Sequence, residues 1–278
     1  MSKKTKVRIA PSPTGNLHLG TARTALFNFL FAKKHKGALI MRIEDTDTSR
    51  STKDYETNII DGLYWLGIVW DEFHRQSERT EIYKKYLNIL LDKGFAYISK
   101  EEGRNGEGEL EIIRMKNKGE KLSFNDQIRG EVSFDTSELG DFVIAKSLTK
   151  PLYHFAVVVD DFDMDISHVI RGDDHISNTA RQILIQEALG APRPKYAHIP
   201  LILAPDRSKL SKRHGPTSID EYRQKGYLPE AMINYLALLG WNPGTEQEIF
   251  DFNELVDAFS LEKVQKGGAI FNEEKLQW

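Results

Sequence analysis

The sequence contains no cysteine, and this absence excludes several kinds of site. A chain without thiols forms no disulfide, binds no zinc through thiolates and has no cysteine nucleophile. It also lacks an apolar run long enough to cross a bilayer, and its first residues carry charge without the apolar stretch of a secretory signal. We therefore expect a cytoplasmic enzyme with no membrane partner.

Excess charge and a nucleotide-binding P-loop are absent as well. The formal net charge is −3, which argues against indiscriminate coating of nucleic acid but not against a local basic face. No Gly-x-x-x-x-Gly-Lys-Ser/Thr pattern occurs, so a P-loop site is not expected. At 278 residues and 40% hydrophobic content, the chain can form one large α/β domain and a smaller inserted or appended one.

Hydrophobic periodicity predicts the order of helices and strands. A strand at 7–10, a helix from about 20 to Gly37 and a strand at 38–43 together predict a parallel sheet. The remaining predictions are helices near 52–66, 78–92 and 176–189, strands at 152–159 and 196–203, a loop at 99–109, short strands over 110–148, and a helical tail from 218. Residue 203 is predicted to end the last strand.

The segment Pro11–Thr21 joins the first predicted strand to the first predicted helix. Ligands of open α/β sheets bind where strands end, and a helix N-terminus directs free N–H groups at an anion. His18 adds a donor for a phosphoryl oxygen, and Gly20 lets a flat base approach the backbone. In isolation, however, a His-x-Gly pattern is more typical of a histidine that caps a helix.

A second polar segment, Lys209–Arg213, lies far downstream. Its cations suit the charge that develops on a leaving pyrophosphate, although such a run is more often an exposed basic turn. Taken together, the two segments predict a site that holds a polyphosphate from two sides.

Four further residues, Arg8, Glu44, Tyr153 and Arg171, stand at or beside the ends of separate predicted strands. Two arginines suit a ligand with two carboxylates, because a guanidinium binds a carboxylate through two hydrogen bonds. An acidic residue beside them can accept hydrogen bonds from an α-ammonium group. The alternative interpretation is four ordinary surface residues that form ion pairs.

Two acidic runs raise the question of a metal site. In the run 160–165, Ile166 stands where a calcium loop needs glycine, and Gly172 stands where it needs glutamate. We predict a solvated turn there, and capping of the following helix for Asp173 and Asp174. The sequence predicts no metal ligands.

These motifs, in this order, resemble the catalytic part of the bacterial glutamyl-tRNA synthetases, a family of class I aminoacyl-tRNA synthetases. The similarity covers nearly the whole chain. The matching segments are 8–15 with 18–21 (the family's "HIGH" segment), 42–47, 75–79, 153–161, 169–175, 209–213 (its "KMSKS" loop) and 226–231.

The resemblance implies ATP-dependent activation of L-glutamate to glutamyl-adenylate and transfer of the glutamyl group to the 3′ end of tRNA-Glu. Mg²⁺ would accompany ATP, and a monomer is expected. By matching position, the catalytic residues would be His18, Lys209 and Lys212. The ATP-binding residues would be Pro11, His18, Gly20, Thr21, Lys209, Leu210, Ser211, Lys212 and Arg213. The glutamate-binding residues would be Arg8, Ala10, Ser12, Glu44, Tyr153 and Arg171.

The resemblance also implies a fold class: an α/β protein with a Rossmann-type parallel sheet, a small inserted α+β acceptor-binding subdomain and a helical C-terminal segment. The expected division is 1–98 and 149–208 for the two halves of the Rossmann domain, 99–148 for a shortened acceptor-stem-binding insertion, and 209–278 for the KMSKS-type loop and the start of a helical stem-contact region. Many relatives bind zinc in the insertion through cysteines, so no zinc is expected here. Because family members continue into anticodon-binding domains, we expect this chain to be part of a longer protein.

Four alternatives remain open at this point. A glutamyl-queuosine tRNA-Asp synthetase lacks an anticodon domain, but its second motif usually degenerates, whereas Lys209–Arg213 is intact here. A glutaminyl-tRNA synthetase usually has different residues at 11–15 and 43–47. A small-molecule adenylyltransferase would not need the paired arginines. An RNA-binding or regulatory module would bind without catalysis.

Overall fold

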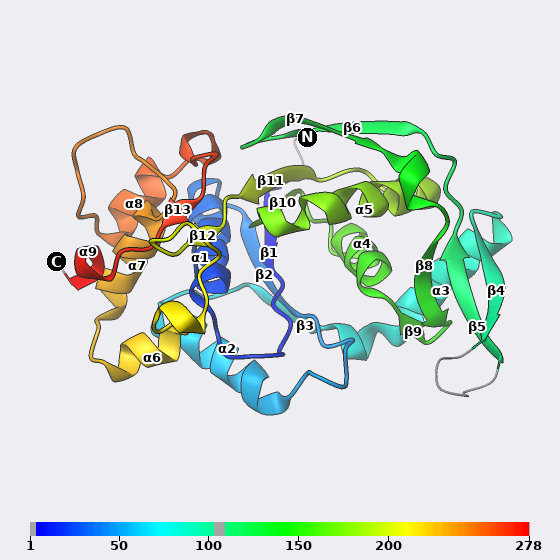
Figure 1. Cartoon of the computed structure of the whole chain (residues 1–278), viewed down its shortest axis with the longest axis horizontal. Coiled ribbons are helices and arrows are strands. Elements are labelled where there is room, and N and C mark those ends of the chain that lie inside the picture. Colours follow the sequence, from blue (N-terminus) through cyan, green and yellow to red (C-terminus); the bar gives the residue numbers. More distant parts are fainter. Residues whose placement is uncertain (1–3, 103–108, 278) are drawn as a thin grey trace.

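The computed structural model describes residues 4–102 and 109–277. Figure 1 shows an elongated molecule with a central sheet, a mostly helical region at the C-terminal end and a β-rich region at the opposite end. Strands β1 (Lys6–Ile9), β2 (Ala38–Ile43) and β3 (Glu72–Arg75) form a parallel sheet in the order β1-β2-β3. Ser167, the residue just before strand β10 (His168–Gly172), bonds to β1. Its N–H donates to Lys6 O at 2.9 Å.

A second sheet extends this layer. Its order is β10-β11-β6-β7, and β10 runs parallel to β11 (Lys195–Ile199). The hairpin of β6 (Lys121–Asp126) and β7 (Gly130–Asp135) joins β11 through the pair Tyr196 and Asp126. Two segments 70 or more residues apart in sequence therefore lie side by side (Figure 1).

The β-rich end is an antiparallel sheet of four strands in the order β4-β5-β8-β9. Its strands are β4 (Ala96–Glu102), β5 (Glu109–Met115), β8 (Phe142–Ser147) and β9 (Lys150–Pro151). Most of these residues fall in the predicted insertion 99–148, whose boundaries stay a prediction. The predicted loop 99–109 is wrong at its two ends, since β4 continues through Glu102 and β5 starts at Glu109; residues 103–108 lie outside the described part.

Helices surround the sheets. They are α1 (Leu19–Lys34), α2 (Lys53–Trp65), α3 (Thr80–Asp92), α4 (Tyr153–Asp163), α5 (Ile176–Leu189), α6 (Ile219–Gln224), α7 (Pro229–Leu238), α8 (Phe252–Ala258) and α9 (Glu273–Gln277). Short 3₁₀ turns are η1 (Gln76–Arg79), η3 (Thr136–Leu139), η4 (Asp173–His175), η5 (Lys212–His214) and η6 (Leu261–Lys263). No described helix is long and apolar enough to span a membrane.

The centre of the fold is α1, which packs against β1, β2 and β10 on one side and against α7 and α8 on the other. Leu26, Phe27 and Leu30 on this helix are at most 1% exposed. A helix that is apolar nearly all round is buried on several faces. This burial holds the start of α1, and with it His18, in a fixed place at the end of β1.

The strand prediction for 152–159 is wrong, because this segment begins α4. The run Val157–Val159 has the β-branched residues that favour strands, but the segment packs against α3, α5 and β8. Tertiary packing overrides such local preference. The prediction for 196–203 is also wrong in part, since β11 ends at Ile199 before Pro200 and a short strand β12 (Ile202–Leu203) pairs with a later strand, β13 (Ala269–Ile270).

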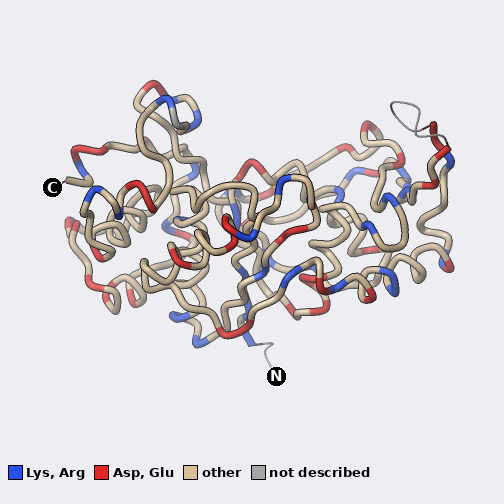
Figure 2. Tube along the Cα trace, turned by 90° about the horizontal axis from the view of Figure 1, so that it is seen from below, with Lys and Arg blue, Asp and Glu red and all other residues tan. Residues whose placement is uncertain are grey.

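Basic and acidic residues are intermixed along the length of the chain (Figure 2). This distribution agrees with the small net charge of −3.

Candidate active site

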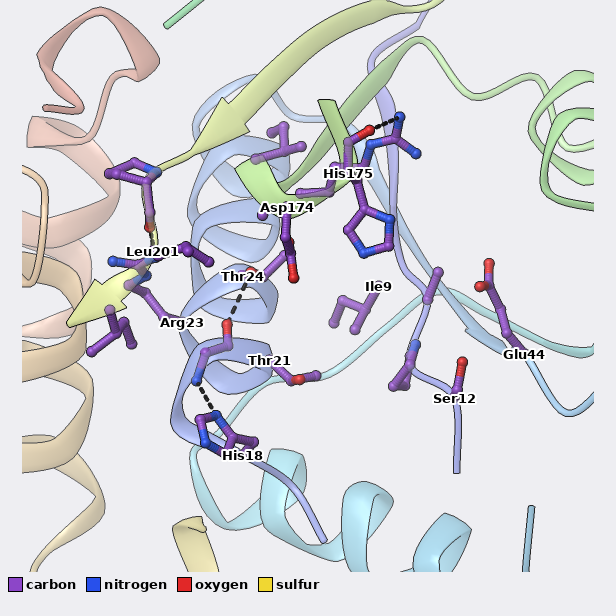
Figure 3. Close-up of a pocket in the computed structure, with 18 of the residues that line it drawn as sticks. Ile9, Ser12, His18, Thr21, Arg23, Thr24, Glu44, Asp174, His175 and Leu201 are labelled. Atoms are coloured by element: carbon purple, nitrogen blue, oxygen red, sulfur yellow. Dashed lines mark hydrogen bonds between the residues drawn. The ribbon is translucent and has the colours of Figure 1, made fainter. Parts of the chain in front are cut away.

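A pocket of about 470 Å³ opens at the carboxyl ends of β1, β2 and β10. Figure 3 shows side chains from these strand ends, from α1 and from the segment after β11 directed into it. The sequence-predicted residues that line it are Arg8, Ala10, Pro11, Ser12, His18, Gly20, Thr21, Glu44, Tyr153, Arg171, Lys209 and Leu210. The structure therefore brings the first motif and the first two residues of the second into one pocket.

His18 is the N-cap of α1 and also lines the pocket, so the capping interpretation and the ligand interpretation apply to the same residue. Its Nδ1 accepts a hydrogen bond from the N–H of Gly20 at 3.1 Å. Burial, assisted by the nearby Lys209, lowers the pKa of His18. The imidazole is therefore neutral at pH 7, with its proton on Nε2, the nitrogen that remains to donate to a ligand.

The chain that follows the Lys209–Arg213 loop is tied to the start of α1 through the backbone at Thr217 and Ile219. The N–H of Leu19 donates to Thr217 O, and the N–H of Ile219 donates to Leu17 O, both at 2.9 Å. The Lys209 ammonium is mostly exposed and lies 3.5 Å from the carboxylate of Asp174, which also lines the pocket. A cation and a helix N-terminus thus meet at one end of the pocket.

The two predicted arginines lie at the other end. Arg8 Nε donates to Asp161 Oδ1 at 3.1 Å, and this is its one side-chain hydrogen bond to the described residues. Arg171 is held through Nε by His198 and through Nη2 by Thr179 Oγ1, at 3.2 and 2.8 Å. Each guanidinium therefore keeps N–H groups for a ligand, although both side chains are about 5% exposed.

Glu44 and Tyr153 complete this end of the pocket. Glu44 Oε1 accepts two hydrogen bonds from Arg42, while no bond from the described residues engages Oε2. Burial raises the pKa of Glu44 in spite of the opposing arginines. The Tyr153 hydroxyl lies 3.0 Å from Nδ1 of His175, and burial followed by the charge of Glu44 raises the pKa of Tyr153 to about 12.

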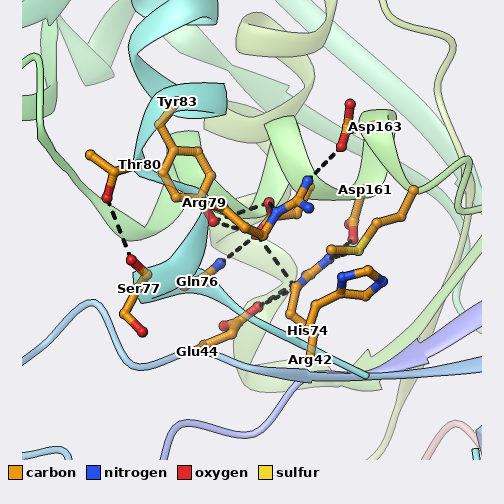
Figure 4. A network of polar contacts seen from close by, with 12 residues as sticks. Arg42, Glu44, His74, Gln76, Ser77, Arg79, Thr80, Tyr83, Asp161 and Asp163 are labelled. Carbon is orange, nitrogen blue, oxygen red and sulfur yellow. Dashed lines mark hydrogen bonds and ion pairs between the residues drawn. The ribbon is translucent and has the colours of Figure 1, made fainter. Parts of the chain in front are cut away.

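A buried ion network supports these residues (Figure 4). Arg42 is fully buried and donates to Glu44 and, at 2.7 Å, to Asp161 Oδ1, the same oxygen that binds Arg8. Arg79 and Tyr83 bind Asp160. The prediction of a solvated turn at 160–165 is therefore wrong for 160–163, which end α4 with Asp160 and Asp161 buried, whereas Met164 and Asp165 do form a turn.

The capping prediction for Asp173 and Asp174 is also wrong, since no side chain caps η4 or α5. Asp173 instead pairs with Arg129 at 2.5 Å, and Asp174 faces Lys209. Both aspartates stand before a helix, which favours a capping role in the sequence. Their actual partners lie more than 30 residues away and cannot be identified from that position.

Sequence reasoning missed several residues that line the pocket. His175 is one; burial lowers its pKa to about 4, so its ring is neutral beside Arg171. Arg23 is another, and its guanidinium binds the carbonyls of Leu239 and Pro200. The signal that could have found Arg23 is a lone arginine inside an apolar run, because a buried charge requires partners, and the same signal applies to Arg42, which is buried outside the pocket lining. The other missed lining residues are Ile9, Thr24, Ile170, Gly172, Asp174, Pro200, Leu201 and Ile202.

Part of the second motif lies outside the pocket lining. Ser211 bonds to Nδ1 of His214 at 3.1 Å, and Arg213 Nε bonds to Nε2 of the same ring at 3.0 Å. Lys212 begins η5 in the same loop. Among the described residues, no group of three or more His, Asp or Glu side chains is placed to hold a metal ion.

A pocket at the carboxyl ends of parallel strands is the place where open α/β folds bind their ligands, so the fold and the pocket define an α/β ligand-binding domain. Residues 4–105 and 99–278 match the family model described as tRNA synthetases class I (E and Q), catalytic domain, and the chain belongs to this family. It is 49% identical to the glutamate–tRNA ligase of Carboxydothermus hydrogenoformans, over 98% of this chain and 66% of the relative. It is 50% identical to the glutamate–tRNA ligase of Aquifex aeolicus, over 99% of this chain and 66% of that relative.

The fold is also that of known structures. A crystal structure of a glutamate tRNA ligase from Elizabethkingia meningosepticum in complex with its amino acid superposes with a TM-score of 0.93 at 37% identity, covering 99% of this chain and 68% of that one. The predicted α/β fold class is thereby confirmed. This chain spans 68% of the length of the protein in that crystal structure. It spans 66% of the length of each of the two glutamate–tRNA ligases, which is slightly less than two thirds.

Proposed function

We propose that this chain activates L-glutamate with ATP to form glutamyl-adenylate, and that it transfers the glutamyl group to the 3′ end of tRNA-Glu. The observation that carries the proposal is one pocket with two partly free guanidinium groups and a carboxylate at one end, and a helix N-terminus with His18 and Lys209 at the other. Relatives named glutamate–tRNA ligase support the same reaction.

The charged groups at the first end complement L-glutamate. Arg8 and Arg171 would each bind one carboxylate, since a guanidinium N–H donates strongly to a carboxylate oxygen. Oε2 of Glu44 would accept a hydrogen bond from the α-ammonium group. The amide side chain of glutamine offers no negative charge to a second arginine, so the pocket favours glutamate. Ala10, Ser12 and Tyr153 would shape this end.

At the other end, the backbone of 18–21 and His18 would face the phosphates of ATP, with Pro11, Gly20 and Thr21 next to the nucleoside. Gly20 is suited to this contact because it lines the pocket without a side chain, and a Cβ there would lie 3.5 Å from His18 Nδ1. Lys209 and Leu210 would approach from the opposite side, and Ser211, Lys212 and Arg213 belong to the same proposed ATP-binding set.

Mg²⁺ would be held mainly by the ATP phosphates and water, which is common for Mg²⁺ at nucleotide sites. Its contribution is to neutralise phosphate charge. No zinc ligand set is proposed.

In the activation step, a carboxylate oxygen of glutamate attacks the α-phosphorus of ATP. A C–O–P bond forms, the bond between the α-phosphorus and its bridging oxygen breaks, and pyrophosphate leaves. No protein nucleophile takes part. His18 Nε2–H and the lysine ammonium groups would stabilise the negative charge that develops on the phosphoryl oxygens and on pyrophosphate. The tRNA 3′-terminal hydroxyl then displaces AMP from the carbonyl carbon. We expect a monomer that acts in the cytoplasm.

The test is acceptor labelling with radioactive L-glutamate and ATP, with tRNA-Glu or queuosine-containing tRNA-Asp offered as the acceptor. A base-labile ester at the tRNA 3′ end is the expected product. Label on the queuosine base of tRNA-Asp would instead identify the glutamyl-queuosine paralogue, and preference for L-glutamine would identify a glutaminyl-tRNA synthetase. Because the chain spans two thirds of its relatives, ATP–pyrophosphate exchange with added tRNA measures activation separately from transfer.

A further inference from the structure

A buried histidine and aspartate stand directly behind Arg171. His198 on β11 is 0% exposed, and Asp126 at the end of β6 is 2% exposed. His198 Nδ1 lies 2.6 Å from Asp126 Oδ2, and Arg171 Nε donates to His198 Nε2 at 3.2 Å. The parallel pairing of β10 with β11 places Arg171 and His198 opposite each other. These three residues form a continuous hydrogen-bonded chain that starts in the β6–β7 hairpin and ends in the pocket.

The donors and acceptors fix the tautomer of His198. A guanidinium can only donate, so Nε2 must accept and carries no proton. The ring proton is therefore on Nδ1, where the Asp126 carboxylate accepts it. Protonation of both nitrogens would point an N–H at the guanidinium, and burial also lowers the pKa of His198. The ring is thus a neutral link between a carboxylate and a cation.

Arg171 differs in this respect from Arg8, which lines the same pocket, and from Arg42 in the buried network beside it. Arg8 and Arg42 pair directly with Asp161, whereas no carboxylate of the described residues lies within ion-pair distance of Arg171. A direct carboxylate would compete with a substrate carboxylate for the guanidinium. The imidazole keeps the negative charge of Asp126 one residue away, yet it fixes the Nε edge and leaves Nη1 unbonded by the described residues.

We propose that Asp126 and His198 are positioning residues that orient Arg171 for a carboxylate of glutamate. This inference rests on the proposed function. It assigns a role in substrate affinity to a residue of the predicted insertion, and it predicts that glutamate binding depends on which nitrogen of His198 carries the proton.

Two amide variants separate the two ring nitrogens. His198→Gln places its amide oxygen near the position of Nε2 and can still accept from Arg171. His198→Asn reaches only as far as Nδ1, so it can donate to Asp126 but leaves the Arg171 Nε–H without an acceptor. The matched pair removes the ring in both cases. Asp126→Asn tests the other end, because an amide can donate to Nδ1 and favours the tautomer with its proton facing Arg171.

The experiment is calorimetric titration of the whole chain with L-glutamate, and separately with ATP, together with thermal unfolding of each variant. His198→Asn and Asp126→Asn should weaken glutamate binding at least about tenfold, the scale of one hydrogen bond to a charged group. His198→Gln should bind within about threefold of wild type on that scale. ATP affinity should not change in any of them, and Arg171→Ala should set the maximum loss for glutamate.

Equal glutamate affinity of His198→Gln and His198→Asn would overturn the inference, and so would a parallel loss of ATP affinity. If His198→Asn fails to fold, the comparison of Asp126→Asn with His198→Gln decides in the same way. Unfolding of all three variants would assign the pair a structural role only. If the wild-type chain binds no L-glutamate, the proposed function itself fails, which is distinct from equal affinity of the two variants.

Discussion

Replacing Arg42 by methionine removes the cation that compensates three buried carboxylates. Arg42 is 0% exposed, and it lies within 3.0 Å of Glu44, 2.7 Å of Asp161 and 3.7 Å of Asp160. Methionine has a similar length but no charge, so the carboxylates lose their shared partner without a large cavity. Breaking a buried ion pair on one side costs about 3–5 kcal/mol of unfolding free energy. This is a large part of the about 5–15 kcal/mol typical of a whole domain.

The destabilisation should depend on pH in a defined direction. In the wild type, Arg8 and Arg42 outweigh burial and hold the pKa of Asp161 below its usual range, so its contribution to stability is present at neutral pH and is lost as pH falls through that lowered pKa. Without Arg42, burial should raise the pKa of Glu44 further and move the pKa of Asp161 upward in the folded state, because each loses an opposing cation. The stability of the variant then falls as pH rises through those raised pKa values. The difference from wild type is therefore larger at neutral than at acidic pH.

Urea unfolding of both proteins at about pH 7.5 and about pH 5 measures this difference. Arg193→Met is the matched control, since Arg193 pairs with Glu187 at the surface and both side chains are at least 39% exposed. An exposed pair contributes about 0–1 kcal/mol, with little dependence on pH in this range. A loss below about 1 kcal/mol for Arg42→Met, or a loss that grows toward acidic pH, would refute the reasoning.

Three further predictions concern the pocket. Gly20→Ala should leave the free energy of unfolding unchanged or raise it by up to about 1 kcal/mol, because the new Cβ would make an ordinary contact 3.5 Å from His18 Nδ1 and alanine favours helix. The KM for ATP should nevertheless rise about tenfold, because the added methyl group would stand where the nucleoside is proposed to bind. A normal KM would show that ATP does not approach Gly20. Lys209→Ala should lower kcat about 100-fold without a change in urea midpoint, because its pairing with Asp174 is exposed; an unchanged kcat would exclude Lys209 from the chemistry. Affinity for L-glutamate should decrease as pH falls through the raised pKa of Glu44, because the protonated carboxyl loses its charge for the ammonium group; constant affinity from about pH 8 to pH 5 in calorimetry would contradict this role.

Apolar periodicity and end signals in the sequence predict the strand at 38–43 and the end of helix α5. The strand at 38–43 has the same bounds in the structure, and α5 ends where Gly190 adopts a left-handed conformation with φ of 69°. Both have a clear apolar pattern and a clear stop signal. Helix α4 lacks a helical apolar pattern, because its β-branched run favours a strand. Only its packing against α3 and α5 shows why it is a helix.

The pocket shows the same limit. Arg8, Glu44 and Arg171 are predictable because they stand at or beside strand ends, which parallel sheets bring together at one edge. Their supports could not be found in this way. Asp161 lies 119 residues from Arg42, and Asp126 lies 72 residues from His198. No window of sequence connects such pairs; a charged residue inside an apolar strand indicates only that some partner must exist.

The central claim is that two segments about 190 residues apart form one pocket for ATP and L-glutamate. A crystal structure with a non-hydrolysable glutamyl-adenylate analogue tests it most directly. We predict the glutamyl side-chain carboxylate at one of Arg8 and Arg171, the ammonium group at Glu44, and the phosphoryl oxygens beside His18. Binding of the analogue elsewhere, or with its glutamyl group away from both arginines, would contradict the account.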